Sequence, residues 1–138
     1  ENFEISLTIG KVIKEFNNDL IYVVLPLSEM EKSAQKLNIK YACEIFADRN
    51  YKDNGHLISR NDKNASIVDP ILASKNILEM LETSSIKCLS GKKLKCNIDT
   101  ICIHGDQLNA VSMSKEIIKK IKKNNIDLLP LNKLEKFN

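Results

Sequence analysis

The chain is poor in the side chains that nucleic-acid-binding proteins use. It has no tryptophan, and aromatic residues make up only 5% of its 138 positions. Its formal net charge is +3, because 21 lysines and arginines are set against 18 aspartates and glutamates. Proteins that bind nucleic acid usually carry a strongly basic face, and single-strand binders add aromatic platforms for the bases. The composition therefore argues against a nucleic-acid partner.

Long apolar runs are also missing. No stretch approaches the roughly 20 apolar residues that a transmembrane helix needs, and the first residues form an acidic amphipathic stretch without the apolar core of a signal peptide. We therefore expect no membrane partner and a cytoplasmic location. The length and the hydrophobic content of 43% suit one globular domain, residues 1–138.

None of the cysteines has the C-x-x-C spacing of common zinc sites. Two of the four lie inside apolar runs of strand length. These features favour buried free thiols in a reducing compartment over disulfides, and they predict no metal site in this chain. The four cysteines are Cys43, Cys88, Cys96 and Cys102.

Common phosphate-binding and catalytic motifs are absent as well. The sequence contains no G-x-G-x-x-G, no Walker loop, no H-E-x-x-H and no G-x-S-x-G. Nucleotide binding and serine hydrolase chemistry therefore find no motif support in this chain.

Arginine is scarce, and its placement is informative. Only two of the 21 basic residues are arginines, and both lie in one segment, at Arg49 and Arg60. A guanidinium presents a planar fork of donors that matches a carboxylate, which an ammonium cannot do. The two arginines are therefore candidates for anion recognition, with surface salt bridges as the alternative.

The apolar periodicity predicts an α/β fold. Helical spacing appears at residues 3–16, 29–37, 70–81 and 111–121, and continuous apolar runs of strand length at 20–25, 40–46, 100–103 and 127–130. Residues 87–96, around Ser90-Gly91, read as a small hairpin. We expect about four parallel strands joined by right-handed helical crossovers, with the strand at 20–25 in the middle of the sheet.

The same periodicity predicts which helix faces are buried. Two starts are marked: Ser28 and Glu31 form a capping-box pattern, and Asp69-Pro70 supplies an N-cap followed by proline. The predicted core residues are Ile5, Ile9, Val12, Ile13 and Phe16 in the first helix, Met30, Ala34 and Leu37 in the second, Ile71, Ile77, Leu78 and Leu81 in the third, and Val111, Ser114, Ile117, Ile118 and Ile121 in the fourth.

Residues 47–68 form an unusually long polar stretch. Loops of this length inside a compact domain are uncommon and are either functional or disordered. Asp53-Asn54-Gly55 is a turn signal that suggests a small hairpin between Tyr51 and Leu57. Disorder is the alternative.

Candidate chemistry lies at the strand ends. In parallel α/β folds ligands bind where the carboxyl ends of strands converge. One strand ends in Asp48-Arg49 and another in His104-Gly105-Asp106. A histidine can transfer protons near neutral pH, and a nearby carboxylate would fix its tautomer. The alternatives are a structural histidine at 104 and a helix cap at Asp106.

Glu44 is unexpected, because it interrupts an apolar strand. A carboxylate in that position must be paired or functional. A salt bridge to a neighbouring strand is the structural alternative.

Two long ungapped stretches resemble the LamB/YcsF family, whose members serve as the A subunit of bacterial 5-oxoprolinase. They are Glu44-Ile45-Phe46-Ala47-Asp48-Arg49-Asn50-Tyr51, with Asp53-Asn54-Gly55 and Arg60 following, and Asp99-Thr100-Ile101-Cys102-Ile103-His104-Gly105-Asp106. The resemblance implies a partial TIM-like (β/α) barrel. After Arg60 the chain departs from the family's Ser-Gln-Pro-Gly-like run, which leaves the loop conformation open.

The resemblance also implies an activity, the ATP-dependent opening of 5-oxoproline to glutamate together with 5-oxoprolinase subunits B and C. ATP would be used by the complex without a binding motif in this chain. Together with the residues at the strand ends, the resemblance leads us to predict His104, Asp106 and Glu44 as catalytic residues and Asp48, Arg49, Tyr51 and Arg60 as substrate-binding residues. Arg49 or Arg60 would hold the substrate carboxylate.

Segments of the family's amino-terminal half are not found in this sequence. We therefore expect the barrel to be completed by a missing amino-terminal half or by a second copy. Two alternatives remain: a non-catalytic remnant that binds a small carboxylate or a protein, and a deacetylase-like metal enzyme. The latter needs an Asp-His-His set, for which no second histidine lies near His104.

Overall fold

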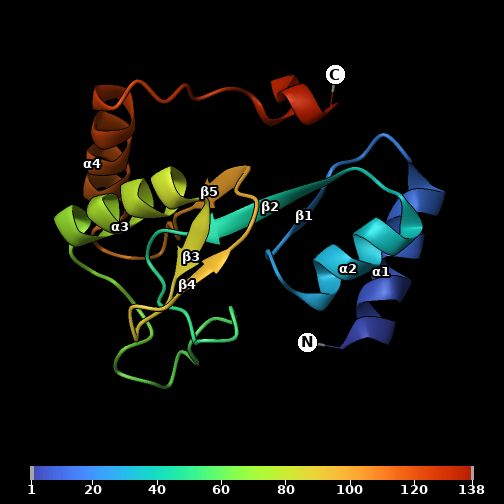
Figure 1. The fold of residues 1–138 in the computed structure, drawn as a ribbon, viewed down its shortest axis with the longest axis horizontal. Coiled ribbons are helices and arrows are strands. Elements are labelled where there is room, and N and C mark those ends of the chain that lie inside the picture. Colours follow the sequence, from blue (N-terminus) through green and yellow to red (C-terminus); the bar gives the residue numbers. More distant parts are fainter. Residues whose placement is uncertain (1, 138) are drawn as a thin grey trace.

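The computed structural model describes residues 2–137 and confirms an α/β fold (Figure 1). Its helices are α1 (Phe3–Phe16), α2 (Glu29–Leu37), α3 (Pro70–Thr83) and α4 (Ala110–Lys123). Its strands are β1 (Tyr22–Val24), β2 (Tyr41–Phe46), β3 (Ser85–Lys87), β4 (Lys93–Lys95) and β5 (Thr100–Cys102), and two short 3-10 turns follow at Leu131–Lys133 and Glu135–Phe137.

The main sheet has three parallel strands in the order β1-β2-β5. The fourth predicted strand, at residues 127–130, is wrong. Leu128 and Leu129 are 54% and 57% exposed, and this segment runs across to the 3-10 turns without strand structure. Proline at 130 cannot donate to a ladder, and it opens the first of those turns. The expected hairpin excursion is confirmed as β3 paired antiparallel with β4.

The prediction that the first strand lies in the middle of the sheet is also wrong. Within residues 2–137, β1 pairs only with β2, so the central strand is β2. Tyr22 and Val24 are buried, but Val23 between them is 39% exposed. The apolar run therefore marks a strand with only one well-covered face.

Both helix pairs cover the same face of the sheet. Cys43 packs in a small core beside α1 and α2, whereas Ile45 packs in the larger core beside α3 and α4. Residues two apart in a strand point the same way, so these two side chains share a face. Glu44 and Phe46 lie on the opposite face, where both are only half-buried.

Helix α1 forms where periodicity predicts it, but its predicted buried face is wrong. The residues that face inward are small, namely Ser6 and Gly10. A Cβ at position 10 would lie 2.6 Å from Leu37 Cδ1, so glycine permits the close approach of α1 to α2. Of the predicted core residues only Ile13 packs against the small core. The exposed ones are Ile5 (60%), Ile9 (45%), Val12 (60%) and Phe16 (81%).

The buried faces of α3 and α4 are confirmed only in part. Ile77, Ile117 and Ile121 are buried as expected, but Ile71 and Val111 are 70% and 68% exposed, and Ile118 is 40% exposed. The two helices pack against each other through a narrower set of side chains, which adds Ala73, Ser74, Met80 and Met113. Periodicity predicted both helices correctly, but the predicted buried faces are rotated slightly about the helix axes from the observed ones.

Both predicted helix starts carry caps. The Asp69 carboxylate accepts the Ile71 N–H at 2.8 Å, with Pro70 first in the helix, as predicted. Ser28 differs from the expected capping box, because its hydroxyl accepts the Met30 N–H at 3.2 Å. Glu31 instead accepts the N–H of Leu27 at 2.7 Å.

The long polar stretch is folded back on itself by backbone hydrogen bonds. Tyr51 and Leu57 form the antiparallel bridge that the turn signal predicts. Arg49 and Ser66 form a second bridge, which brings the two ends of the loop together. The loop therefore forms a wall beside the carboxyl end of β2.

Candidate active site

The sheet brings Asp48 and His104 side by side. Phe46 of β2 is in register with Cys102 of β5, and the ladder continues with Ala47 N–H donating to Cys102 O at 2.9 Å. Asp48 and His104 each lie two residues beyond the end of their strand. Because the strands are parallel, both side chains emerge at the same edge of the sheet.

Asp48 is fully buried and holds His104 by two different groups. His104 Nδ1 lies 2.8 Å and 2.9 Å from the two carboxylate oxygens, and the His104 backbone N–H donates to Oδ2 at 3.2 Å. An ionised carboxylate can only accept, so Nδ1 carries the hydrogen and Nε2 is left as the acceptor of the neutral ring. The Phe46 ring stacks on the imidazole at 5.4 Å. This geometry confirms the expectation that a carboxylate orients His104.

Glu44 lies on the same face of β2 as Phe46. Burial raises the pKa of the Glu44 carboxyl, and the nearby His104 side chain opposes that shift. Within residues 2–137 Glu44 forms no salt bridge to a neighbouring strand, so the structural alternative for it is wrong.

A cavity of about 440 Å³ opens beside His104. It brings together four of the predicted site residues from two distant segments: Arg49, Arg60, His104 and Asp106. The other three predicted residues, Glu44, Asp48 and Tyr51, do not line it. The remaining lining residues are Ser66, Val68, Gln107, Leu108 and Asn109.

The two arginines differ sharply. Arg49 is 6% exposed, and its guanidinium is hydrogen-bonded to the loop. Nε donates to Ala65 O at 3.2 Å, and Nη2 donates to Ile58 O at 2.6 Å. Arg60 is exposed and makes no ion pair within residues 2–137. Arg49 therefore shapes the cavity wall, and Arg60 offers a guanidinium that a ligand can use.

Tyr51 supports the end of β2 from inside the loop. Its side chain is 1% exposed, and its hydroxyl oxygen accepts the backbone N–H of Phe46 at 2.7 Å. Burial raises the pKa of the phenol further above its usual range. The contact anchors the loop to the strand that carries Asp48.

Asp106 is exposed at the cavity, and the capping role considered for it is wrong. Helix α4 begins only at Ala110, with Asn109 in the cap position and no side-chain cap. The side chain of Asn109 instead donates to Val68 O at 3.0 Å, which ties this segment to the loop.

Sequence reasoning missed Gln107. Its side-chain Nε2 donates to Asp48 Oδ2 at 2.9 Å, so it shares the carboxylate with His104. The residue directly follows the His-Gly-Asp run, and that proximity is the only signal in the sequence that could have pointed to it.

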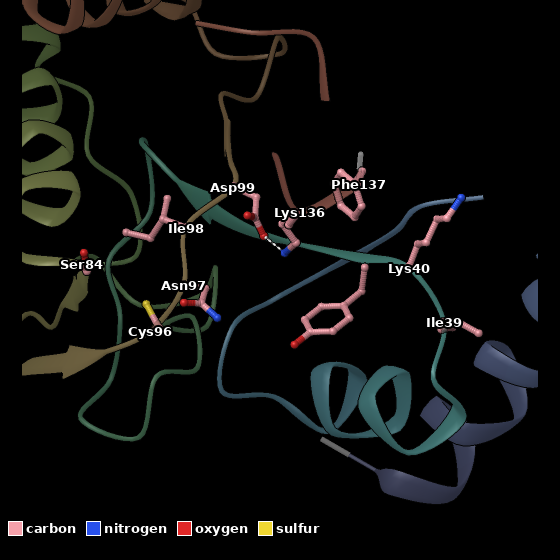
Figure 2. Close-up of a pocket in the computed structure, with 10 residues that line it drawn as sticks. Ile39, Lys40, Ser84, Cys96, Asn97, Ile98, Asp99, Lys136 and Phe137 are labelled. Carbon is pink, nitrogen blue, oxygen red and sulfur yellow. Dashed lines mark hydrogen bonds and ion pairs between the residues drawn. The ribbon is translucent and has the colours of Figure 1, made fainter. Parts of the chain in front are cut away.

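A larger cavity, of about 580 Å³, lies at the opposite end of the sheet (Figure 2). There Asp99 Oδ2 accepts the Cys43 backbone N–H and the Lys136 ammonium, both at 2.7 Å. Lys136 also lies over the Tyr41 ring at 4.9 Å. This cavity contains no imidazole and sits at the amino ends of the strands, whereas parallel sheets bind ligands at the carboxyl ends. We therefore take the cavity beside His104 as the candidate active site.

No group of three or more metal-binding side chains comes together among residues 2–137. The four cysteines are free, and two of them, Cys43 and Cys88, are buried as predicted, whereas Cys96 and Cys102 are only half-buried. Burial and the nearby Glu31 raise the pKa of the Cys43 thiol to about 12, so this thiol stays protonated at neutral pH. No helix in the described part of the chain is long and apolar enough to cross a membrane.

Residues 1–136 match the model of the LamB/YcsF family. The chain belongs to the LamB/YcsF family. Among its LamB/YcsF relatives is a Clostridium beijerinckii protein named as the A subunit of 5-oxoprolinase, with 34% identity over 97% of this chain and 52% of that protein. A protein of the same name from Coprothermobacter proteolyticus is 33% identical over 94% of this chain and 50% of its own length.

The fold is similar to a crystal structure of a lactam utilization protein from Thermus thermophilus. The TM-score is 0.81 at 26% sequence identity, over 93% of this chain and 51% of that one. The chain thus spans about half the length of the LamB/YcsF relatives it matches.

Proposed function

We propose that the chain supplies part of the active site of a 5-oxoprolinase, an enzyme that opens the lactam ring of 5-oxoproline to give glutamate. The observation that carries the proposal is the Asp48–His104 pair beside a cavity that also exposes Arg60. The names of the relatives, the A subunit of 5-oxoprolinase and lactam utilization protein, support the same class of substrate.

The proposed chemistry assigns proton transfer to His104. Hydrolysis of a lactam breaks its C–N bond, with the hydroxyl of water going to the carbonyl carbon and a proton going to the nitrogen. The unprotonated Nε2 of His104 can take the proton from the attacking water and return it to the departing nitrogen. Asp48 keeps Nδ1 protonated, so that Nε2 remains the working atom.

Substrate binding is assigned mainly to Arg60. The guanidinium is exposed at the cavity and matches the carboxylate of 5-oxoproline. Arg49 and Tyr51 keep the loop folded around it, through the carbonyl of Ile58 and the N–H of Phe46. Asp106 at the cavity rim and Glu44 beside His104 are the further carboxylates available for proton transfer.

A lactam is a poor electrophile, which explains why ATP is part of the proposal. Transfer of the terminal phosphoryl group of ATP to the lactam oxygen by a partner protein, with release of ADP, would make the carbon reactive. Water would then add to that carbon, the C–N bond would break, and hydrolysis of the resulting acyl phosphate would release inorganic phosphate and glutamate. Subunits B and C would perform the phosphoryl transfer, and the remaining part of the LamB/YcsF fold would complete the site. That part is an amino-terminal half or, in the alternative, a second copy of this chain.

The test is ATP-dependent release of glutamate from 5-oxoproline with subunits B and C and an amino-terminal half present. Activity should fall at least about a hundredfold in His104→Gln, because general acid–base catalysis contributes that much or more. Arg60→Ala should raise KM with a smaller change in kcat, since the guanidinium binds the substrate carboxylate in ground state and transition state alike. A glutamate yield that does not depend on His104 contradicts the proposal.

Binding without turnover is the second candidate function, because the exposed guanidinium of Arg60 can bind a small carboxylate whether or not a reaction follows. Calorimetry with 5-oxoproline and the chain alone separates the two. Heat of binding that is lost in Arg60→Ala, with no glutamate formed under any pairing, would favour a carboxylate-binding remnant over the enzyme.

A further inference from the structure

We infer that Gln107 is a positioning residue that sets the proton affinity of His104 by sharing the carboxylate of Asp48. The inference deepens the proposed function, because it rests on His104 as the group that transfers protons. It assigns a role to a side chain that no motif in the sequence marks. The argument depends on three contacts of one buried carboxylate.

The Asp48 carboxylate is closed off from solvent, so its protein partners determine where its charge acts. It is 0% exposed, and its oxygens accept from His104 Nδ1, from the His104 backbone N–H and from Gln107 Nε2. Oδ2 takes part in all three contacts. A donor bonded to a carboxylate stabilises its charged form and draws part of that charge away from its other partners.

The orientation of the Gln107 amide is dictated by Asp48. An ionised carboxylate accepts but cannot donate, so the NH₂ group of the amide must face it. The amide oxygen is then left buried without a hydrogen-bond partner within residues 2–137. If the amide were rotated by 180°, its oxygen would face the Asp48 carboxylate, and two acceptors would oppose each other. The hydrogen bond to Asp48 is therefore kept at the cost of an unpaired amide oxygen, which indicates a specific role for Gln107 at Asp48.

Removing this donor should concentrate the charge of Asp48 on His104. The protonated ring gains from a stronger negative neighbour, so the pH at which His104 takes up its proton should rise. The other charged groups around the ring are Glu44 on β2 and the cavity residues Arg49, Arg60 and Asp106. Substitution at 107 leaves all four unchanged.

The first measurement needs no substitution. In the ¹⁵N-labelled chain the side-chain amide signals of Gln107 should shift with pH at the same midpoint as the ring nitrogens of His104, since both are bonded to Asp48. The chain contains only two histidines, and His56 provides an internal reference. Gln107 amide signals that do not follow His104 overturn the inference.

The second measurement compares variants by the same titration. Gln107→Leu removes the donor at similar size and should shift the His104 midpoint to higher pH. Leu108→Ala is the matched control, because Leu108 lines the same cavity and is fully exposed. It should leave the midpoint unchanged.

A purely structural role for Gln107 gives a different result. Gln107→Leu would then lower the melting temperature without raising the His104 midpoint. A midpoint that stays in place or falls overturns the inference. If Gln107→Leu does not fold, Gln107→Met and the amide titration of the unaltered chain decide. None of these readouts requires turnover, so failure here is distinct from failure of the glutamate assay.

Discussion

Asp48 and Asp99 join the same two strands at opposite ends of the sheet, and only one of them holds a side chain suited to proton transfer. Asp48 follows β2 and accepts the backbone N–H of His104, just beyond β5. Asp99 precedes β5 and accepts the backbone N–H of Cys43, within β2. Each carboxylate thus links the two strand segments by accepting a backbone N–H that is not paired within the sheet.

The difference lies in the second partner of each carboxylate. Asp48 holds the imidazole of His104, a type of group that transfers protons in many active sites, whereas Asp99 holds the ammonium of Lys136 in an ion pair. The same backbone device therefore gives a candidate proton-transfer site at the carboxyl end and a fixed clamp at the amino end. The identity of one side chain, more than the geometry of the sheet, separates the two ends.

We expect the largest difference between the two aspartates when each is replaced by asparagine. Asp48→Asn would place an amide N–H against Nδ1 of His104 and favour the tautomer that protonates Nε2, so the glutamate-forming rate should fall about 100- to 10 000-fold. Asp99→Asn should leave that rate within about twofold, because Lys136 takes no part in proton transfer. Both rates come from the glutamate assay with partner subunits. Equal losses in the two variants would mean that the ends of the sheet are not functionally distinct.

The next largest effect is expected on stability. Asp99→Ala leaves the N–H of the buried Cys43 without its acceptor, and we expect the free energy of unfolding to fall by about 1–3 kcal/mol. Urea denaturation of the chain measures it. Asp127→Ala, at an exposed carboxylate, is the control and should change the free energy by less than about 0.5 kcal/mol. If Asp99→Ala lowers the free energy of unfolding no more than Asp127→Ala does, Asp99 does not stabilise the amino end of the sheet.

Glu79 provides a surface counterpart to the two aspartates. It joins α3 to the β3–β4 hairpin, with Lys87 Nζ and Lys93 Nζ each 2.8 Å from its carboxylate, and these two lysines lower its pKa to about 2. The folded-state pKa lies below the ordinary value of 4.5. The stabilisation is therefore fully present above pH 4.5 and is lost as the pH falls towards 2.

Thermal unfolding at a series of pH values measures this contribution. Glu79→Gln should lower the melting temperature at about pH 6, and the difference from the unaltered chain should shrink between pH 4.5 and pH 2. A difference of constant size across that range would show that packing of the side chain, and not its charge, joins the hairpin to α3.

The juxtaposition of Asp48 and His104 was predictable only in part. Two apolar runs ending in polar residues predict parallel strands, and parallel strands present their carboxyl ends at one edge. The sequence did not predict that these two strands are neighbours, because it placed the strand at 20–25 in the middle of the sheet. The structure pairs β2 with β5, and the cavity there brings Arg49, Arg60 and Asp106 beside His104.

The roles within that cluster were not predictable in the same way. Arg49 and Arg60 look alike in sequence, and only the path of the loop buries the first and exposes the second. Asp106 was a plausible cap until the helix proved to start at Ala110. Gln107 belongs to no motif and becomes important only through a contact 59 positions away, with Asp48.

Helix α1 shows the other limit. A period of about 3.6 residues reveals an amphipathic helix but does not reveal whether its apolar side meets a partner within the same chain. The structure turns Ser6 and Gly10 inward and leaves most of the larger residues in the open. Closure of the sheet into a barrel, for which the resemblance also argued, stays a prediction.

The smallest predicted effect separates the two bonds of Asp99. The side chain of Lys136 is 35% exposed, so its ion pair is weakened by solvent, and Lys136→Met should cost less than about 1 kcal/mol of unfolding free energy while keeping the packing on Tyr41. In the double variant with Asp99→Ala the Lys136 change should add almost nothing, because the ion pair is already lost. Urea denaturation at low and high salt measures both. If Lys136→Met alone costs as much as Asp99→Ala, the ion pair and not the bond to Cys43 holds the amino end, and the two aspartates would no longer work by the same backbone device.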